Sequence, residues 1–212
     1  MTLILSEIAV GNTKNQTQLE AWNTQLIQWG AKLMQARWAM VNDMNEILKA
    51  NYTQVSSQPD PLRIEYMPNV ACDAPETAKI CLEQKLADIS GKEKWRGTSL
   101  AGPHRDEFVF YIGSRDIRRY GSRGEHKSVL VSLKAAESRF LHRASGTPPI
   151  ILLDDLYAEL DNDRAGQVMS LFKDKSQVFV TGTSLDYKKL FTSSEAEESG
   201  VYFVENGVVS KQ

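Results

Sequence analysis

The chain is organised around residues 150–161, Ile-Ile-Leu-Leu-Asp-Asp-Leu-Tyr-Ala-Glu-Leu-Asp. It follows Pro148-Pro149, and its four leading aliphatic residues predict a strand buried on both faces, as in a parallel sheet. Asp154 and Asp155 then fall at the carboxyl end of that strand, where open α/β sheets bind their ligands. Adjacent carboxylates suit a divalent metal, one holding Mg²⁺ and the next orienting or deprotonating water. The alternative is a strand end whose acids cap the next helix.

Composition and charge exclude several classes of protein. With 212 residues and 42% hydrophobic content, the chain can bury one good core or two small ones. The formal net charge of −2 means that any contact with nucleic acid must come from a local basic patch. Cys72 and Cys81 have no histidine nearby, so two free thiols in a reducing cytosol are expected. Because no secretion signal or membrane-spanning apolar run is present, we expect a soluble, cytoplasmic protein without membrane contact.

The first part of the chain, residues 1–95, is predicted to be a mainly helical domain. Apolar residues at spacings of three and four over 19–47 predict one long amphipathic helix. Alternating side chains predict a short strand over 62–67. Asp73, followed by a proline in the first turn, predicts the start of another helix, which is expected to stop at Gly91.

The remainder, residues 96–212, is predicted to be an α/β lobe. It combines short strands with helices, and an Asn-Gly pair near its end is a strong hairpin signal. The helices are expected from residue 123 onward and over 162–173. The strands are expected over 107–112, around 116–119, over 150–153, over 177–181, and as a hairpin over 201–209.

Glycines mark a candidate anion site at the start of the helix that precedes the Asp-Asp strand. The segment is Gly121-Ser122-Arg123-Gly124. A Gly-Ser-x-Gly segment at a helix start presents backbone N–H groups, a hydroxyl and the positive end of the helix dipole to an anion. The alternative is a plain N-cap by Ser122.

Three motifs in a fixed order resemble the C-terminal half of an ATP-binding-cassette ATPase head. These are the signature motif at 121–124, the Walker B strand at 150–155, and the D-loop Ala158-Glu159-Leu160-Asp161. Within that superfamily, residues 101–106 (Ala-Gly-Pro-His-Arg-Asp) and the helical stretch 19–37 resemble the RecF family of bacterial DNA replication and repair proteins. The resemblance covers nearly all of the chain. It implies an α/β fold, the C-terminal half of an ATP-binding-cassette-type ATPase head with a mainly helical lid domain.

The resemblance also implies an activity. Proteins of the RecF family bind DNA in an ATP-dependent way, act at single-strand gaps with RecO and RecR, and help to load RecA in the response to DNA damage. Two heads dimerise around two ATP molecules, so each signature motif contacts the nucleotide of the opposite subunit. Single-stranded or gapped duplex DNA, ATP and Mg²⁺ are therefore the implied ligands.

Specific roles follow from the resemblance, position by position. Ser122 and Gly124 would contact the γ-phosphate in trans. Asp154 would hold Mg²⁺, and Asp155 would position or activate the attacking water. Asp161 would couple the two sites across the dimer.

The sequence departs from the family pattern at two places. The phosphate loop G-x-x-x-x-G-K-[ST] is absent, because Gly91-Lys92 lacks the earlier glycine and is followed by Glu. Residues 125–127 are Glu-His-Lys, where the family usually carries Gln-Gln-Arg, and an acid there opposes a triphosphate by Coulomb repulsion. In addition, Thr183 occupies the switch position, where many cassettes have histidine.

A local basic cluster is the candidate DNA surface. Its density of Lys and Arg can neutralise phosphates without reading the base sequence. A solvated basic face is the alternative. The cluster consists of Arg115, Arg118, Arg119, Arg123 and Lys127, with Arg105 as a possible neighbour.

Three functions therefore compete. The first is a RecF-like repair ATPase, active only if a P-loop segment is supplied by another chain or by a missing N-terminal part. The second is a non-enzymatic remnant or interaction module that neither binds nor hydrolyses ATP. The third, disfavoured by the ordered motifs, is an unrelated Mg²⁺-dependent phosphohydrolase that uses Asp154 and Asp155 alone.

Overall fold

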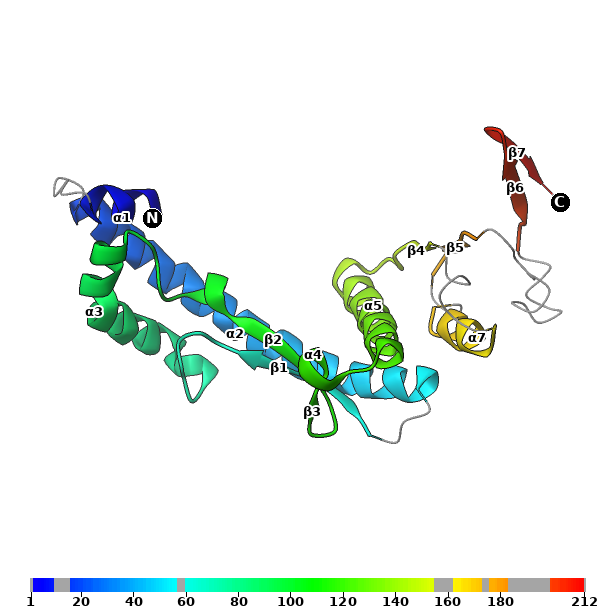
Figure 1. The fold of residues 1–212 in the computed structure, drawn as a ribbon, viewed down its shortest axis with the longest axis horizontal. Coiled ribbons are helices and arrows are strands. Elements are labelled where there is room, and N and C mark those ends of the chain that lie inside the picture. The colour runs from blue at the N-terminus through cyan, green and yellow to red at the C-terminus, as the bar shows by residue number, and fades with distance from the viewer. Residues whose placement is uncertain are drawn as a thin grey trace. The chain divides into compact units, whose positions relative to one another are not determined.

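A computed structural model describes residues 2–9, 16–56, 60–154, 162–172, 176–182 and 199–211, with only the backbone described at residues 2, 3 and 162–165. The described elements, drawn in Figure 1, form two compact units. Unit 1 comprises Met1–Lys49 and Asp60–Ser122, and unit 2 comprises Ala50–Pro59 and Arg123–Gln212. In chain order the elements are α1 (Thr2–Ala9), α2 (Gln16–Val55), β1 (Leu62–Met67), η2 (Pro75–Thr77), α3 (Ala78–Arg96), η3 (Pro103–Arg105), β2 (Glu107–Ile112), β3 (Arg115–Asp116), α4 (Ile117–Tyr120), α5 (Arg123–Ser145), β4 (Ile151–Leu153), α7 (Asn162–Ser170), β5 (Val178–Val180), β6 (Tyr202–Glu205) and β7 (Val208–Lys211).

The long helix predicted over 19–47 is confirmed and extends further in both directions, as α2. Its apolar stripe supplies buried side chains along unit 1, among them Leu19, Met34 and Met44. Gly30 lies on this stripe, where an added Cβ would stand 3.3 Å from Leu82 and from Pro103. The absence of a side chain at Gly30 therefore lets α3 and the segment before β2 approach α2 closely.

The sheet of unit 1 is antiparallel, with strand order β1-β2-β3. Strands β1 and β2 have the predicted bounds and pair from Leu62 with Ile112 to Met67 with Glu107. β1 is an edge strand, so its outer backbone groups need partners. Asn45 of α2 supplies them at Ile64, because its Nδ2 donates to the Ile64 carbonyl at 3.0 Å and its Oδ1 accepts from the Ile64 N–H at 2.8 Å. The helix and the sheet are thereby joined by a side-chain pair as well as by apolar packing.

Helix α3 corrects the predicted helix end at Gly91. The helix continues through Gly91 and ends before Gly97, which adopts a φ of 65°. A left-handed residue is a common helix terminator, whereas a glycine inside a helix only lowers its stability. Asp73 does not cap, since the turn η2 begins after Ala74 without a side-chain cap. The terminus at Gly97 is fixed by α1, an element without a clear sequence signal, because a Cβ there would stand 3.0 Å from Ser6 Cα.

The strand predicted around 116–119 is wrong. β3 contains only Arg115 and Asp116, and the chain then turns into the short helix α4. The cause is local, because the Asp116 carboxylate accepts a hydrogen bond from the Arg118 N–H at 2.9 Å. Asp at this position caps a helix start more readily than it continues a strand.

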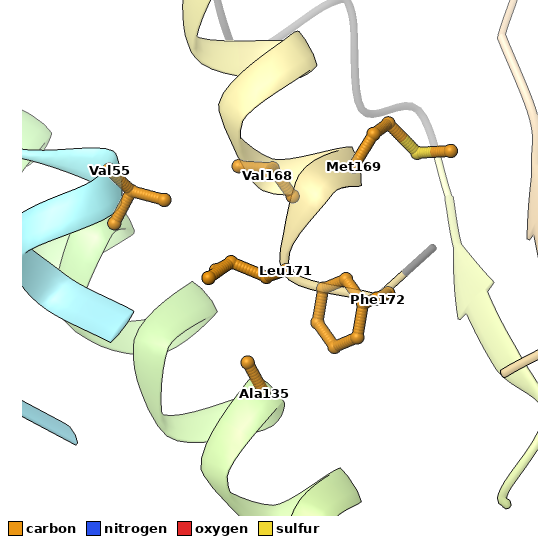
Figure 2. Close-up of a cluster of buried hydrophobic side chains, with 6 residues drawn as sticks. All are labelled: Val55, Ala135, Val168, Met169, Leu171 and Phe172. Carbon is orange, nitrogen blue, oxygen red and sulfur yellow. The ribbon is translucent and has the colours of Figure 1, made fainter. Parts of the chain in front are cut away.

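The core of unit 2 is a cluster of apolar side chains between helices (Figure 2). The end of α2, helix α5 and the segment from α7 to the turn after it all contribute. On the polar side, Asn51 Nδ2 donates to the Ser132 carbonyl of α5 at 3.1 Å. The buried members of the cluster are Val55, Ala135, Val168, Met169, Leu171 and Phe172.

Strand β4 confirms the predicted strand at 150–153, shortened by one residue, and pairs in parallel with β5. The prediction that this strand is buried on both faces is wrong. Ile151 and Leu153 pack on the unit 2 core, but Leu152 is 75% exposed and its neighbour Phe179 is 50% exposed. Side chains alternate across a strand, and no described element covers the second face. A central position for β4 in a larger sheet stays a prediction.

The hairpin predicted near the C-terminus is confirmed as β6 and β7. Asn206 and Gly207 have φ values of 50° and 80°, and two consecutive positive φ values are what a two-residue type I′ turn requires. No described helix has both the length and the apolar character needed to span a membrane.

The two compact units do not divide at residue 95, where the change in composition placed a boundary. The reason is the pairing of β1 with β2, which joins segments from both sides of residue 95 into one sheet. The division into a lid domain of residues 1–95 and a head lobe of residues 96–212 therefore stays a prediction about the family's domains.

Candidate functional site

The carboxyl ends of β4 and β5 bring two polar side chains together. Asp154 follows Leu153 directly, and Thr181 follows Val180 on the neighbouring strand. The Thr181 N–H donates to the Leu153 carbonyl at 3.0 Å, which extends the ladder by one bond. The Thr181 hydroxyl donates to Asp154 Oδ1 in a short hydrogen bond. Asp154 is thus exposed at the end of a parallel strand, with a partner that the sequence patterns did not reveal.

The residues around Asp154 could bind a hydrated Mg²⁺, but they do not form a site in which protein side chains supply all the metal ligands. Within the described ranges, no group of three or more His, Cys, Asp or Glu residues is placed to hold a metal. Mg²⁺ usually keeps several waters and binds proteins through one or two carboxylates plus substrate phosphates. Asp154 offers such a carboxylate, since it is exposed and forms no ion pair with any described residue.

Three of the predicted site residues lie outside the described residues. These are Asp155, Asp161 and Thr183. Their predicted roles as water-positioning acid, coupling residue and switch residue therefore stay predictions.

The signature segment lies at a helix start, as its sequence indicated. Ser122 is exposed and directly precedes α5, and Gly124 lies in the first turn of that helix. The N–H groups of a helix's first turn lack partners within the helix, and in general they bind an anion or a capping side chain. Glu125 also lies in that first turn. A carboxylate there stabilises the helix through its dipole and competes with a phosphate for the same positive end.

The predicted basic cluster is partly neutralised by neighbouring acids. Arg118 pairs with Glu107 at 3.1 Å, and Arg119 pairs with Asp116 at 3.6 Å. These arginines belong to unit 1, whereas Arg123 is in unit 2, where it is exposed and forms no ion pair with a described residue.

The remaining basic candidates are also divided between the two units. Arg115 lies in unit 1 and Lys127 in unit 2, and both are half-buried. The Arg105 guanidinium is hydrogen-bonded to the backbone, since its Nε and Nη2 donate to the Ser99 carbonyl at 3.0 and 2.7 Å. A single DNA surface formed by the whole cluster stays a prediction.

The Gly-Pro-His-Arg-Asp segment positions a buried carboxylate. The Asp106 side chain is 1% exposed and accepts hydrogen bonds from Arg37 Nη1 at 2.7 Å, from the Asn69 N–H at 2.9 Å and from the Tyr66 hydroxyl. Burial raises the pKa of the Tyr66 phenol well above its ordinary value, and the bond to the Asp106 carboxylate adds to this effect. Gly102, the first residue of the segment, has a φ of 127°, a conformation that favours glycine. The motif thus joins α2, β1 and the start of β2.

The two cysteines are free thiols on neighbouring elements of unit 1. Burial raises the pKa of the Cys72 thiol to about 12, and a hydrogen bond with Cys81 acts in the same direction. A thiol that stays protonated at neutral pH is a poor nucleophile. Neither a metal site nor a catalytic role is indicated for Cys72.

Comparison with known proteins connects these features to one family. No family model matches the chain. A curated protein from Halothermothrix orenii is 30% identical over 98% of this chain and 56% of its own length, and its name is DNA replication and repair protein RecF. The resemblance to RecF is confirmed. RecF from Geotalea uraniireducens is 35% identical over 79% of this chain, and RecF from Staphylococcus aureus is 32% identical over 86%.

The fold agrees with the sequence relationship. A solved structure described as the recombination mediator protein RecF with ATP in the RecFOR pathway matches 100% of this chain, with a TM-score of 0.80 and 20% identity. The match covers 54% of that RecF chain. The expected fold, about half of RecF, is thereby confirmed. The chain spans about half the length of the curated relatives it matches.

Proposed function

We propose that this chain acts in bacterial DNA replication and repair as a RecF-like protein that binds DNA at single-strand gaps in an ATP-dependent way. The observation that carries the proposal is the relationship to RecF over nearly the whole chain in both sequence and fold. Cooperation with RecO and RecR and assistance to RecA loading belong to the same proposal, and the RecFOR pathway named for the solved relative supports them. Its place is the cytoplasm, because two free thiols fit a reducing compartment.

The ATPase reaction requires a P-loop segment in addition to the residues of this chain. Asp154 would hold Mg²⁺, which neutralises charge on the phosphates when it is bound. Asp155 would orient the attacking water. Ser122 and Gly124 would contact the γ-phosphate of a nucleotide bound by the opposite subunit, and Asp161 would couple the two sites.

The exposed face of the β4–β5 pair supports the need for further polypeptide. Ile150, Leu152 and Phe179 are between 50% and 75% exposed on this unit. Parallel strands in proteins are normally covered on both faces, because apolar side chains on the open face gain by leaving water. We therefore propose that a P-loop-containing half, in the same or another chain, covers this face, and that the completed heads form an ATP-dependent homodimer.

A second function is favoured by one specific observation. Glu125 occupies the first turn of α5, where the family usually has an uncharged Gln and where the resemblance places a phosphate contact. A carboxylate at this point opposes the triphosphate and stabilises the helix without it. Under this alternative, the chain keeps the fold and acts as an interaction module that neither binds nor hydrolyses ATP.

Reconstitution tests the proposal against the alternative. The chain is combined with the N-terminal half of the Halothermothrix orenii RecF, and binding to a gapped DNA duplex is followed by fluorescence anisotropy with and without ATP and Mg²⁺. We expect binding to the gapped duplex that requires ATP, with weaker binding to a fully paired duplex as the control. A folded complex whose DNA binding is absent or indifferent to ATP would favour the interaction module.

A further inference from the structure

The partner of Asp154 is fixed by the register of the two parallel strands. The Thr181 N–H bonds to the Leu153 carbonyl, so the backbone places the Thr181 side chain beside the residue that follows Leu153, which is Asp154. Threonine is β-branched and therefore stiff at χ1, so its hydroxyl keeps a narrow range of directions. The hydrogen bond from that hydroxyl to Asp154 Oδ1 follows from this placement.

This hydrogen bond orients the Asp154 carboxylate without cancelling its charge. The donor is a neutral hydroxyl, and Asp154 forms no ion pair with a described residue. An Arg or Lys partner would instead compete with a cation for the carboxylate. This bond takes Oδ1, and no described residue bonds to Oδ2, which can therefore receive a metal ion or a water bound to it. An exposed aspartate without such a partner would divide its time among several rotamers.

We propose that Thr181 is a positioning residue for metal binding, which holds the Asp154 carboxylate in the orientation that receives a hydrated divalent cation. The proposal rests on the proposed function, since that function gives Asp154 its metal role. Hydrogen-bond partners of metal ligands commonly determine affinity in this way, by fixing the orientation of the ligand. A substitution at Thr181 does not disturb buried packing, because Thr181 is exposed and follows the last residue of β5.

The test uses four variants of the whole chain. Thr181→Val removes the hydroxyl at nearly constant shape and keeps a residue that favours strands, and Thr181→Ser restores the hydroxyl. Thr147→Val is the matched control, because Thr147 is also exposed in unit 2 but precedes β4 at its opposite end. Asp154→Asn removes the charged ligand.

Two measurements by nuclear magnetic resonance are made on each variant. The first is the carboxyl carbon shift of Asp154, which reports its hydrogen bond without any metal. The second is the selective broadening of nearby amide signals by Mn²⁺, a paramagnetic substitute for Mg²⁺, titrated to give an apparent affinity.

We expect Thr181→Val to move the carboxyl shift and to weaken Mn²⁺ binding about tenfold, the lower end of the cost of removing a hydrogen-bond partner from a metal ligand. Thr147→Val should match the wild type in both measurements, and Thr181→Ser, which keeps the hydroxyl but loses the β-branch, should lie closer to the wild type than Thr181→Val does. Asp154→Asn should abolish the local broadening. An unchanged carboxyl shift in Thr181→Val would overturn the proposal.

The remaining outcomes separate this proposal from the proposed function. If Thr181→Val moves the shift but leaves Mn²⁺ affinity unchanged, Thr181 does not position the ligand, although Asp154 keeps its metal role. If the wild type shows no broadening around Asp154, or if Asp154→Asn broadens equally, the metal assignment of the proposed function fails and the role of Thr181 fails with it.

Discussion

Arg37 Nη1 donates to Asp106 Oδ2 at 2.7 Å, across 69 positions of sequence, and the same guanidinium nitrogen donates to the Pro103 carbonyl at 2.6 Å. The carboxylate is buried, whereas the Arg37 side chain is 23% exposed. One arginine of α2 thereby binds both the turn η3 and the residue that leads into β2. This pairing gives a structural reason for the Asp of the Gly-Pro-His-Arg-Asp segment.

Asp106→Asn should destabilise unit 1. The change removes the charge that balances Arg37 and weakens the acceptor for Tyr66 and the Asn69 N–H. Breaking a fully buried pair costs about 3–5 kcal/mol, and partial exposure of Arg37 places our expectation at about 2–3 kcal/mol. The measurement is the free energy of unfolding by urea, followed by circular dichroism.

The control for Asp106→Asn is Glu65→Gln. Glu65 pairs with Arg63 on β1, and both side chains are 41% exposed. Exposed pairs contribute about 0–1 kcal/mol, so this variant should stay close to the wild type. Equal losses from the two substitutions would contradict the central role of Asp106.

Two glycines, one within α3 and one directly after its end, should respond in opposite directions to alanine. Gly91 is helical, with nothing within 4 Å of an added Cβ, so Gly91→Ala should stabilise the protein by about 0.4–1 kcal/mol. Gly97 has a φ of 65°, and its Cβ would meet Ser6 Cα at 3.0 Å. Gly97→Ala should therefore destabilise by more than about 1 kcal/mol, and thermal unfolding of both variants measures the difference. A stabilising Gly97→Ala would mean that α1 does not pack at this helix end.

Alkaline pH should destabilise the protein through two groups of unit 1. The folded-state pKa of Cys72 is raised from 9.0 to about 12, and that of Tyr66 is raised from 10.0. In both cases the unfolded chain loses its proton first, so the stability due to the protonated form is complete below pH 9.0 and is lost as pH rises toward 12. Urea unfolding between pH 8 and pH 11 should show the decline.

Two substitutions separate the contributions to that decline. Cys72→Ser should flatten its first part, and Tyr66→Phe should flatten the part above pH 10.0, because neither replacement titrates in this range. Tyr202→Phe, on the exposed strand β6, is the control and should leave the profile unchanged. Identical profiles in all of these variants would show that other groups cause the decline.

The chain alone should have negligible affinity for ATP. A P-loop supplies most of the phosphate-binding N–H groups and the lysine, and this sequence contains no G-x-x-x-x-G-K-[ST]. Calorimetric titration with ATP and Mg²⁺ should show no tight site, with the reconstituted complex as the positive control. Micromolar binding to the chain alone would reveal a nucleotide pocket outside the proposed site.

Asp154→Asn and Asp155→Asn should differ in the reconstituted complex. Asp154→Asn should weaken the binding of Mg²⁺-ATP, because an amide is a poorer partner for a hydrated cation. Asp155→Asn should spare binding and slow turnover by about 10²- to 10⁴-fold, the usual cost of losing a positioned base. Nucleotide binding and steady-state hydrolysis measure the two effects. Hydrolysis that is unchanged in both variants would refute the Walker B role of this strand.

Local sequence patterns were enough to predict the elements that depend on near neighbours. The strands at 62–67 and 107–112, the long α2 helix and the Asn206-Gly207 hairpin all follow from side-chain period and turn chemistry. The ordered motifs around Ser122 and Asp154 also sufficed to identify RecF relatives. Local patterns failed where two local signals competed, as at Asp116, which caps α4 and ends β3.

Contacts between residues that are distant in sequence became known only from the packing of the elements. The register of β4 against β5 gives Asp154 its partner Thr181, and no spacing within either strand contains that information. Likewise, Gly97 and not Gly91 ends α3, because the approach of α1 and a positive φ act at Gly97 alone. The exposure of Leu152 is a further case, since an aliphatic run predicts burial but cannot specify which element provides the cover. Which residues far apart in the sequence come into contact depends on how whole elements pack. A local sequence pattern does not encode that packing.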